Sequence, residues 1–300
     1  MLMGEGAFNA RLQSIKAAID ARNMTIDRLN GLLALADEME DEDDAIAERK
    51  AAKRGMEEAT EAKEALEKLL ADVIRDWKEE KNRVIGHVVL SPPISFNYGD
   101  DGFTDDWAVV QVYPTKIARL NFIGNVIDLG SVNDYELTTW MYPHPANPKS
   151  FRYPGDRLLK CHGTVSDKEM YRPDPRNQDH NEEPVVMVLK NGNTTGLTVG
   201  RLNTIRAFVR HYFDGAPGEM SKEVSVLPRI LKRHAYLFSE CGDSGSVVID
   251  GTGRIYGIIT GGEGATDATD CTYVTSINFL LKRLAAFGIK ANIFPLPADL

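Results

Sequence analysis

Proline is distributed unevenly along this 300-residue chain, and that distribution constrains the fold more than any other feature. Residues 1–82 contain no proline, whereas all 14 prolines lie at or beyond Pro92. Because proline disrupts the interior of a helix, only the first segment permits long helices. The charge changes at the same place, since residues 1–82 carry 13 Lys and Arg against 20 Asp and Glu and the remainder carries 22 against 24. We therefore expect a domain boundary near Asn82.

Apolar residues in the first segment recur at spacings of three and four, which places them on one face of a helix. Two such stripes are formed by Leu12, Ile15, Ile19, Ile26, Leu29 and Leu33, and by Ala59, Leu66, Leu69, Leu70, Val73 and Trp77. Between them, residues 37–44 hold seven acids in eight positions, a density that disfavours a continuous helix. Residues 1–82 are predicted to form an antiparallel helical hairpin or coiled coil. We interpret the acidic run as a solvated turn, with recruitment of a basic partner as the alternative.

Beyond residue 82, short runs of branched residues alternate with turns rich in Gly, Pro, Asn and Asp. The runs predicted as strands are 84–90, 107–112, 125–129, 158–162, 185–189, 197–212, 247–250, 255–260 and 273–276, and 278–287 is predicted as a closing helix. Many short strands separated by turn signals are typical of a β-sandwich or a β-barrel.

Composition disfavours several classes of protein. No run of about 18 apolar residues exists, so a membrane partner is not expected, and the residues after Met1 lack the features of a signal peptide. The net charge of −9 argues against nucleic acid as a partner. Cys161, Cys241 and Cys271 are too few and too scattered for a disulfide framework or a zinc site. We expect no cofactor, no metal and a reducing, cytoplasmic location.

The nucleophile candidate is Ser244, in the segment Gly242-Asp243-Ser244-Gly245 just before a predicted strand. Glycines on both sides permit a tight turn that a Cβ would block. Such a turn presents the serine hydroxyl to solvent. It can also direct the backbone amides of Gly242 and Ser244 at one point, the geometry of an oxyanion hole. The pattern favours acyl transfer, although ordinary turns use the same residue types.

This segment resembles the nucleophile loop of trypsin/chymotrypsin-like serine peptidases. The resemblance extends to 190–200, similar to a glycine-rich hairpin, to 253–262, similar to the hairpin beside the primary specificity pocket, and to 272–277, similar to the last strand. It implies that six strands within 157–287 form one barrel. The predicted fold class is an all-β trypsin-like double β-barrel with an incomplete first barrel and a long N-terminal helical hairpin. Its domains would be 1–82, the helical hairpin, 83–150, the partial first barrel, and 151–300, the second barrel with its C-terminal helix.

The resemblance also assigns the acid of a catalytic triad. Asp106, in Asp106-Trp107-Ala108-Val109, matches the family's Asp-X-Ala-Leu motif and would orient a histidine from the start of a buried strand. Of the six histidines, only His87 precedes Asp106, as the family order requires. Because His87 lies in the middle of a strand-like run, we interpret it as structural. His211 and His234 follow Asp106 and would require a different topology.

The first barrel lacks the strands that would carry the family's histidine. A group of fungal intracellular trypsin-like proteins has a histidine-bearing β segment before a coiled coil. This chain resembles that group in the runs 83–88, 103–109, 124–130 and 242–246. The resemblance implies that the histidine segment would precede residue 1, so the chain as given is expected to be inactive or incomplete.

Phe238 lies six residues before the nucleophile, at the floor of the primary specificity pocket in this family. No acid is present there to bind a substrate Lys or Arg, so we expect an apolar or occluded pocket. Its other residues would be Thr260, Gly261 and Gly262. Asp243, which in secreted members pairs with a newly made N-terminus, is expected either to find a local donor or to leave the oxyanion hole misformed.

Two hypotheses of function follow. In the first, the chain is a serine endopeptidase-like hydrolase that acts on a peptide or protein substrate. In the second, it is a catalytically inactive pseudoprotease that binds a protein partner through its helical hairpin. A third and weaker interpretation is a coiled-coil scaffold joined to an unrelated β domain.

Overall fold

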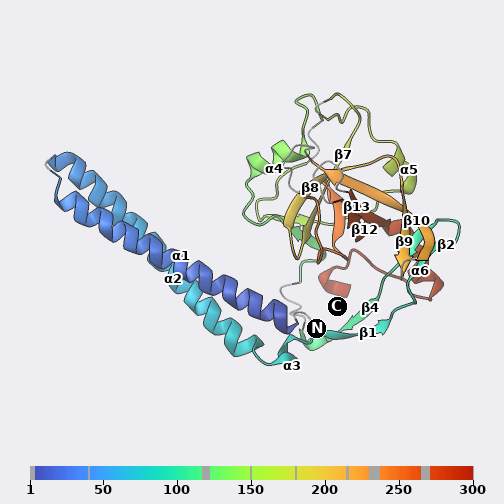
Figure 1. Cartoon of the computed structure of the whole chain (residues 1–300), viewed down its shortest axis with the longest axis horizontal. Coiled ribbons are helices and arrows are strands. Elements are labelled where there is room, and N and C mark those ends of the chain that lie inside the picture. The colour runs from blue at the N-terminus through green and yellow to red at the C-terminus, as the bar shows by residue number, and fades with distance from the viewer. Residues whose placement is uncertain are drawn as a thin grey trace. The chain divides into compact units, whose positions relative to one another are not determined.

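The computed structural model describes residues 4–39, 41–116, 122–148, 151–179, 181–213, 216–229, 237–264 and 271–299 (Figure 1). The chain divides into two compact units. One comprises Met1–Val89 with Val109–Ile117, and the other comprises Leu90–Ala108 with Ala118–Leu300. Among the described residues, no helix combines the length and the apolar character needed to cross a membrane.

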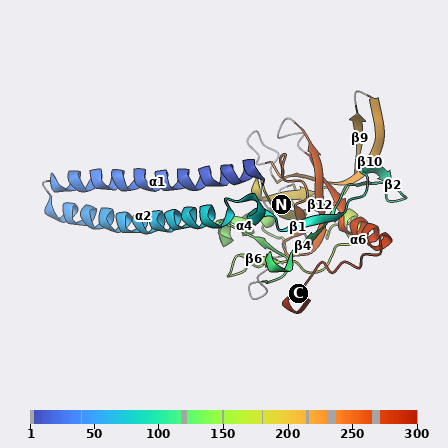
Figure 2. The same cartoon turned by 90° about the horizontal axis from the view of Figure 1, so that it is seen from below.

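The predicted helical hairpin is confirmed. Helix α1 (Glu5–Asp37) and helix α2 (Glu42–Trp77) run side by side in opposite directions (Figure 2). The predicted apolar stripes are buried or half-buried except at Leu69, which is 40% exposed. The fully buried positions of α2 are alanines at seven-residue intervals, namely Ala45, Ala52 and Ala59. Small side chains at this interval let the two helices approach closely.

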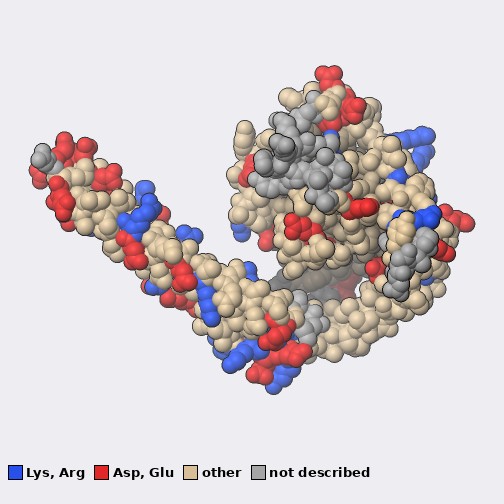
Figure 3. Space-filling view, in the orientation of Figure 1, with Lys and Arg blue, Asp and Glu red and all other residues tan. Residues whose placement is uncertain are grey.

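The acidic run forms the end of one helix, the turn and the start of the next. Helix α1 ends at Asp37, and Asp41 caps α2 by accepting hydrogen bonds from the amides of Asp43 at 3.0 Å and Asp44 at 3.2 Å. Carboxylates in the first turn are also stabilised by the positive end of the helix dipole. Arg49 Nε reaches back to Asp37 Oδ1 at 2.7 Å. Acidic side chains therefore gather at this end of the hairpin (Figure 3).

The rest of this unit is small. Helix α3 (Glu80–Arg83) leads into strand β1 (Gly86–Leu90), which pairs with β4 (Val109–Val112), and the short 3-10 helix η1 covers Pro114–Lys116. Arg83 is 1% exposed and donates to Glu5 at 2.9 Å and to the carbonyl oxygens of Trp77 and Lys78. The buried Arg83 guanidinium therefore connects the start of α1 to the end of α2.

The second unit is built around a seven-stranded antiparallel sheet. Its strand order is β13 (Cys271–Ser276), β12 (Ile255–Glu263), β11 (Val247–Asp250), β7 (Val186–Gly192), β8 (Gly196–Leu202), β10 (Ala216–Pro228) and β9 (Ala207–Phe213). Strand β10 also pairs with β13, with Val224 opposite Val274. Six strands therefore pair in a cycle, and β9 extends from it as a hairpin with β10.

The sequence predicted six late strands, but it did not identify correctly which strands pair in the cycle. The predicted strand 158–162 is β6 (Leu158–Lys160), which pairs with β5 (Val126–Asp128) outside the cycle. Strand β10 takes the place in the cycle that was expected for residues 158–162. The sequence did not predict β10 because the first half of that strand carries glycine and charged residues. The predicted run 197–212 is two strands, β8 and β9, separated by a break at residues 203–206.

The described strands before β7 do not close a first barrel. They form three two-stranded sheets: β1–β4, β5–β6, and β2 (Ser95–Tyr98) with β3 (Phe103–Asp105). The helices among the described residues of the second unit are α4 (Asp134–Met141), α5 (Asp167–Tyr171), α6 (Ile277–Ala286) and the 3-10 helix η3 (Pro297–Asp299).

The core of the second unit lies between the main sheet and the segments packed on it. Its completely buried apolar side chains include Leu129, Leu137, Met170, Val188, Leu189, Val224, Val226, Phe238, Val248, Ile249 and Val274. Helix α6 packs against β3, where the ring centroids of Phe103 and Phe279 lie 5.4 Å apart. Arg283 of α6 also binds Asp105 at 2.8 Å. These contacts fix the segment that carries Asp106.

Candidate active site

Ser244 lies in an exposed turn directly before β11. The flanking Gly242 and Gly245 have φ values of +102° and +84°, in the region that favours glycine. The turn is attached to β12, because the amide of Gly245 donates to the carbonyl of Ile259 at 2.7 Å and the amide of Ile259 donates to Ser246 at 3.0 Å. The two glycines thus present the serine hydroxyl to solvent on a turn held by the sheet.

Asp243, next to the nucleophile, is completely buried and has local donors. It forms an ion pair with Lys190 of β7 at 3.2 Å, and Lys190 is also 0% exposed. Its carboxylate accepts from Thr195 Oγ1 at 2.6 Å, from the amide of Thr194 at 2.7 Å and from the amide of Glu240 at 3.2 Å. The sequence did not predict Lys190, although a lysine within an apolar strand is a usable signal for a buried partner.

The electrostatics of this pair favour the charged aspartate. Burial by itself raises the pKa of Asp243, but the hydrogen bonds from Thr195, Thr194, Glu240 and Lys190 outweigh burial and hold that pKa well below its usual range. Burial lowers the pKa of Lys190, and Asp243 opposes that shift. The buried carboxylate therefore anchors the nucleophile turn to the β7–β8 hairpin.

The predicted oxyanion-hole amides are not used by other groups. Within the described part of the chain, the amides of Gly242 and Ser244 donate no hydrogen bond, whereas the amide of Asp243 between them donates to Glu240. Two uncommitted N–H donors, one of them on the exposed serine itself, are the components that stabilise a tetrahedral oxyanion.

The expected position of Asp106 at the start of a buried strand is wrong. The buried strand β3 ends at Asp105, which is 1% exposed and binds Arg283 and the indole N–H of Trp107. Asp106 follows it with an exposed side chain. The two neighbouring acids therefore differ in role: Asp105 is neutralised by a structural arginine, and Asp106 faces a cavity.

That cavity brings together three of the predicted site residues. It has a volume of about 720 Å³ and is lined by Asp106, Thr260 and Gly261, along with residues of β2 and of the β9–β10 hairpin. Thr260 directly follows Ile259, the residue whose backbone holds the Ser244 turn. The cavity and the nucleophile turn are therefore attached to adjacent positions of the same strand, β12.

Phe238 belongs to the core and does not line an open pocket. It is 0% exposed, and its carbonyl accepts from Thr198 Oγ1 at 2.7 Å. A Cβ on Gly200 would fall 2.7 Å from the Phe238 ring, so this strand glycine leaves the space that the ring occupies. Gly262 is exposed near the end of β12. The ring of Phe238 is therefore part of the core, and its place at the floor of a specificity pocket stays a prediction.

Among the described side chains, no histidine forms a hydrogen bond or an ion pair with Ser244. His87 belongs to the other compact unit, where its ring lies 5.7 Å from that of Tyr113. His144 accepts a hydrogen bond from Ala146, and His162 is exposed. His180, His234 and the side chain of His211 lie outside the described residues.

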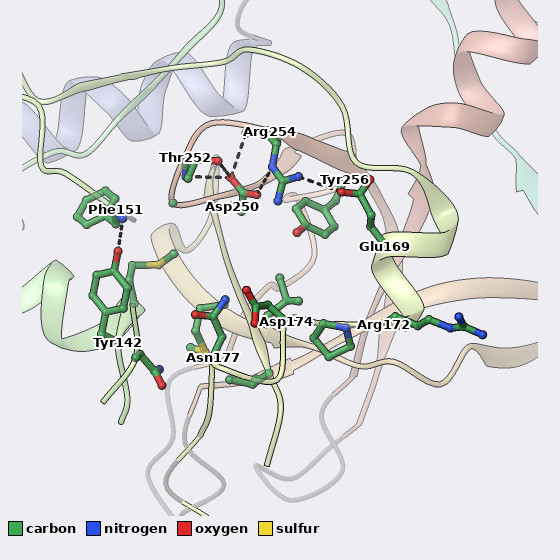
Figure 4. Close-up of a pocket in the computed structure, with 17 residues that line it drawn as sticks. Tyr142, Phe151, Glu169, Arg172, Asp174, Asn177, Asp250, Thr252, Arg254 and Tyr256 are labelled. Atoms are coloured by element: carbon green, nitrogen blue, oxygen red, sulfur yellow. Dashed lines mark hydrogen bonds and ion pairs between the residues drawn. The ribbon is translucent and has the colours of Figure 1, made fainter. Parts of the chain in front are cut away.

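A second cavity of about 370 Å³ lies beside the β11–β12 turn (Figure 4). On its wall Asp250 binds Arg254 at 2.9 Å, and Arg254 extends to Glu169 of α5 at 3.3 Å. Arg254 thus forms ion pairs with the carboxylates of both Asp250 and Glu169. They join the β11–β12 turn to α5 and have a structural explanation.

The family model of the equine arteritis virus serine endopeptidase S32 matches residues 216–287, from β10 to the end of α6. A search of curated proteins finds no match.

Similar solved structures are serine proteases. One, described as a glutamic-acid-specific serine protease with a histidine triad in substrate binding, is 14% identical, with a TM-score of 0.37, and the match covers 68% of this chain and 72% of that one. A chymotrypsin of Cellulomonas bogoriensis is 17% identical, with a TM-score of 0.31 and coverage of 68% and 87%. A Nocardiopsis protease is 20% identical, with a TM-score of 0.28 and coverage of 44% and 55%.

The strand cycle, the glycine-flanked serine turn and the family match define a serine peptidase fold. The β-rich part of the chain has a trypsin/chymotrypsin-like fold, and a long helical hairpin precedes it. Such a fold is consistent with a peptide or protein substrate.

Proposed function

We propose that the chain carries out serine-type peptide-bond hydrolysis with Ser244 as the nucleophile. The observation that carries this proposal is an exposed serine whose own amide and that of Gly242 are uncommitted, on a turn anchored by the buried Asp243–Lys190 pair. The Ser244 hydroxyl oxygen attacks the peptide carbonyl carbon while its proton passes to a base. The amides of Gly242 and Ser244 stabilise the oxyanion. The tetrahedral intermediate then collapses, and the amine leaves with the proton held by the base. Water hydrolyses the remaining acyl-enzyme.

In this proposal Asp106 orients the imidazole of the general base and stabilises its charged form. A serine hydroxyl is a weak nucleophile without such a base. Among the described side chains of the β-rich unit, neither His144 nor His162 forms a hydrogen bond with Ser244. We therefore propose that a histidine outside these described side chains acts as the base, and that peptidase activity requires its imidazole beside Asp106.

Covalent labelling tests the nucleophile. A fluorophosphonate probe should label the folded full chain, and Ser244→Ala should abolish the label. Ser246→Ala, two residues along the same turn, should leave it unchanged and serves as the matched control. Labelling that persists in Ser244→Ala would refute the assignment. A cooperatively folded chain that takes no label would refute activity and support the alternative below.

The alternative is an inactive peptidase-fold protein that acts through its helical hairpin. The exposed apolar side chains of that hairpin favour it, because Met24 is 72% exposed, Leu35 61% and Ile46 53%. The acidic turn would add attraction for a basic partner. In either case we propose a cytoplasmic location, which the small number of scattered cysteines supports.

A further inference from the structure

An open groove lies on the exposed face of α2, close to the turn of the helical hairpin. It has a volume of about 760 Å³, and its described lining comes from α2 alone. Ile46 supplies its largest apolar side chain and is 53% exposed. The charged side chains that line it are four cations and one acid, namely Arg49, Lys50, Lys53, Arg54 and Glu57. This surface, the basic groove, therefore joins an exposed apolar side chain to a band of positive charge.

The two lysines of the basic groove lack an acidic partner. Lys50 lies three residues before Lys53 and four before Arg54. Like charges at these spacings are neighbours on the helix surface and destabilise the helix. No ion pair among the described residues includes Lys50 or Lys53. The groove therefore carries positive charge that an acidic partner would compensate.

Acidic side chains without a cation lie nearer the turn on the same helix. Glu42 and Asp43 are exposed in the first turn of α2, and neither belongs to an ion pair in the part of the chain that the structure describes. Glu42 precedes Lys50 by eight residues, whereas ion pairs along one helix form at spacings of three or four. Figure 3 shows the same succession, with acidic side chains at the end of the hairpin and basic ones beside them. The acids and the lysines of one chain therefore do not neutralise each other.

The arrangement of these groups is complementary to itself. Glu42, Ile46 and Lys50 follow one another at intervals of four, so they share one helical face in the order acid, apolar, base. When a second α2 is laid antiparallel with Ile46 opposite Ile46, Glu42 of each chain faces Lys50 of the other. A two-fold axis makes each such contact twice. A parallel alignment in the same register would instead place acid against acid and base against base.

We propose that the basic groove is a docking surface for a second copy of this chain, antiparallel about Ile46. The inference goes beyond the peptidase function and does not depend on it. The two Ile46 side chains contribute apolar contact at the axis. The charged pairs set the orientation, because exposed ion pairs add little affinity but like charges opposite one another are unfavourable. The dimer is therefore weak and sensitive to salt.

Analytical ultracentrifugation of the full-length chain tests this proposal. The chain should show a reversible equilibrium between monomer and dimer, and Ser244→Ala should dimerise like the parent. Raising the ionic strength from about 0.1 M to about 1 M shortens the Debye length from about 10 Å to about 3 Å, so the dissociation constant of the dimer should rise several-fold. A chain that stays monomeric at concentrations up to about 1 mM would overturn the proposal.

Charge reversal locates the contact. Lys50→Glu and Glu42→Lys each place like charges opposite one another, so each should raise the dissociation constant at least about tenfold. A mixture of the two variants restores both contacts, because one chain then supplies two acids and the other two lysines, and it should form heterodimers about as tightly as the parent. Lys68→Glu, exposed on α2 outside the groove, is the matched control and should change nothing.

Two further outcomes would contradict the proposal. A dimer that persists unchanged in both Lys50→Glu and Glu42→Lys would exclude the basic groove as its interface. Variants that lose the dimer singly and do not regain it when mixed would exclude the antiparallel register. Neither outcome bears on the labelling of Ser244, so a failure of this inference is distinguishable from a failure of the peptidase function.

Discussion

Replacing Lys190 by methionine gives the sharpest test of the nucleophile turn. Methionine keeps most of the side-chain volume and removes the charge, which leaves Asp243 buried and ionised. Removing one partner of a buried ion pair costs about 3–5 kcal/mol. Four donors to Asp243 remain at 2.6, 2.7, 3.2 and 3.3 Å, so we expect the lower end of that range, about 3 kcal/mol. This is roughly a hundredfold in the ratio of folded to unfolded protein.

Urea unfolding followed by far-UV circular dichroism measures this cost. The double variant Lys190→Met with Asp243→Asn removes both charges and should be more stable than Lys190→Met alone, because no buried charge remains without its cation. Fluorophosphonate labelling should slow in the single variant, since the turn loses its anchor. A double variant that is less stable than Lys190→Met would refute the reasoning.

The same pair has a pH signature with a defined sign. The folded pKa of Asp243 lies below its ordinary value of 3.8. Its contribution to stability is therefore present above about pH 4 and is lost as the pH falls through the folded pKa. The difference in unfolding free energy between the parent chain and Asp243→Asn should shrink as the pH is lowered below 4. A difference that stays constant from pH 7 to pH 2 would contradict the ionised state of Asp243.

Two packing predictions complete the set. Gly192→Ala would place a Cβ against Asp243 Oδ1, so it should lower the free energy of unfolding by about 1–3 kcal/mol and slow fluorophosphonate labelling. The control Gly155→Ala meets open space and should leave urea unfolding nearly unchanged. Ala52→Leu overfills the buried contact between α1 and α2 and should lower the free energy of unfolding by about 1–3 kcal/mol. The control Ala47→Leu, on the exposed face of α2, should not. Equal melting temperatures of the two variants would contradict close packing of the helices.

The predictable features are those that depend on a residue and its near neighbours. The helical hairpin could be predicted because a proline-free stretch with apolar spacings of three and four has only one amphipathic structure. Positive φ values at Gly242 and Gly245 follow from the glycine pattern around Ser244. The strands β11 and β12 also begin where the sequence placed them.

The features that were missed depend on partners far along the chain. Strand β10 is a strand because it pairs with β8, β9 and β13, although its own first half carries glycine and charge. Asp106 leaves the buried strand because Asp105 takes the buried position and binds Arg283, 178 residues later. No local pattern contains that information.

The sequence by itself determined that this chain has a long helical part, a β-rich part and one serine on a glycine-flanked turn, because steric limits and side-chain periodicity act over a few residues. Only the tertiary structure decided that Asp243 finds its cation in Lys190, 53 residues away, and that Glu223 lies buried without one among the described residues. Burial makes charges costly, and the compensation for that cost depends on which distant strands meet.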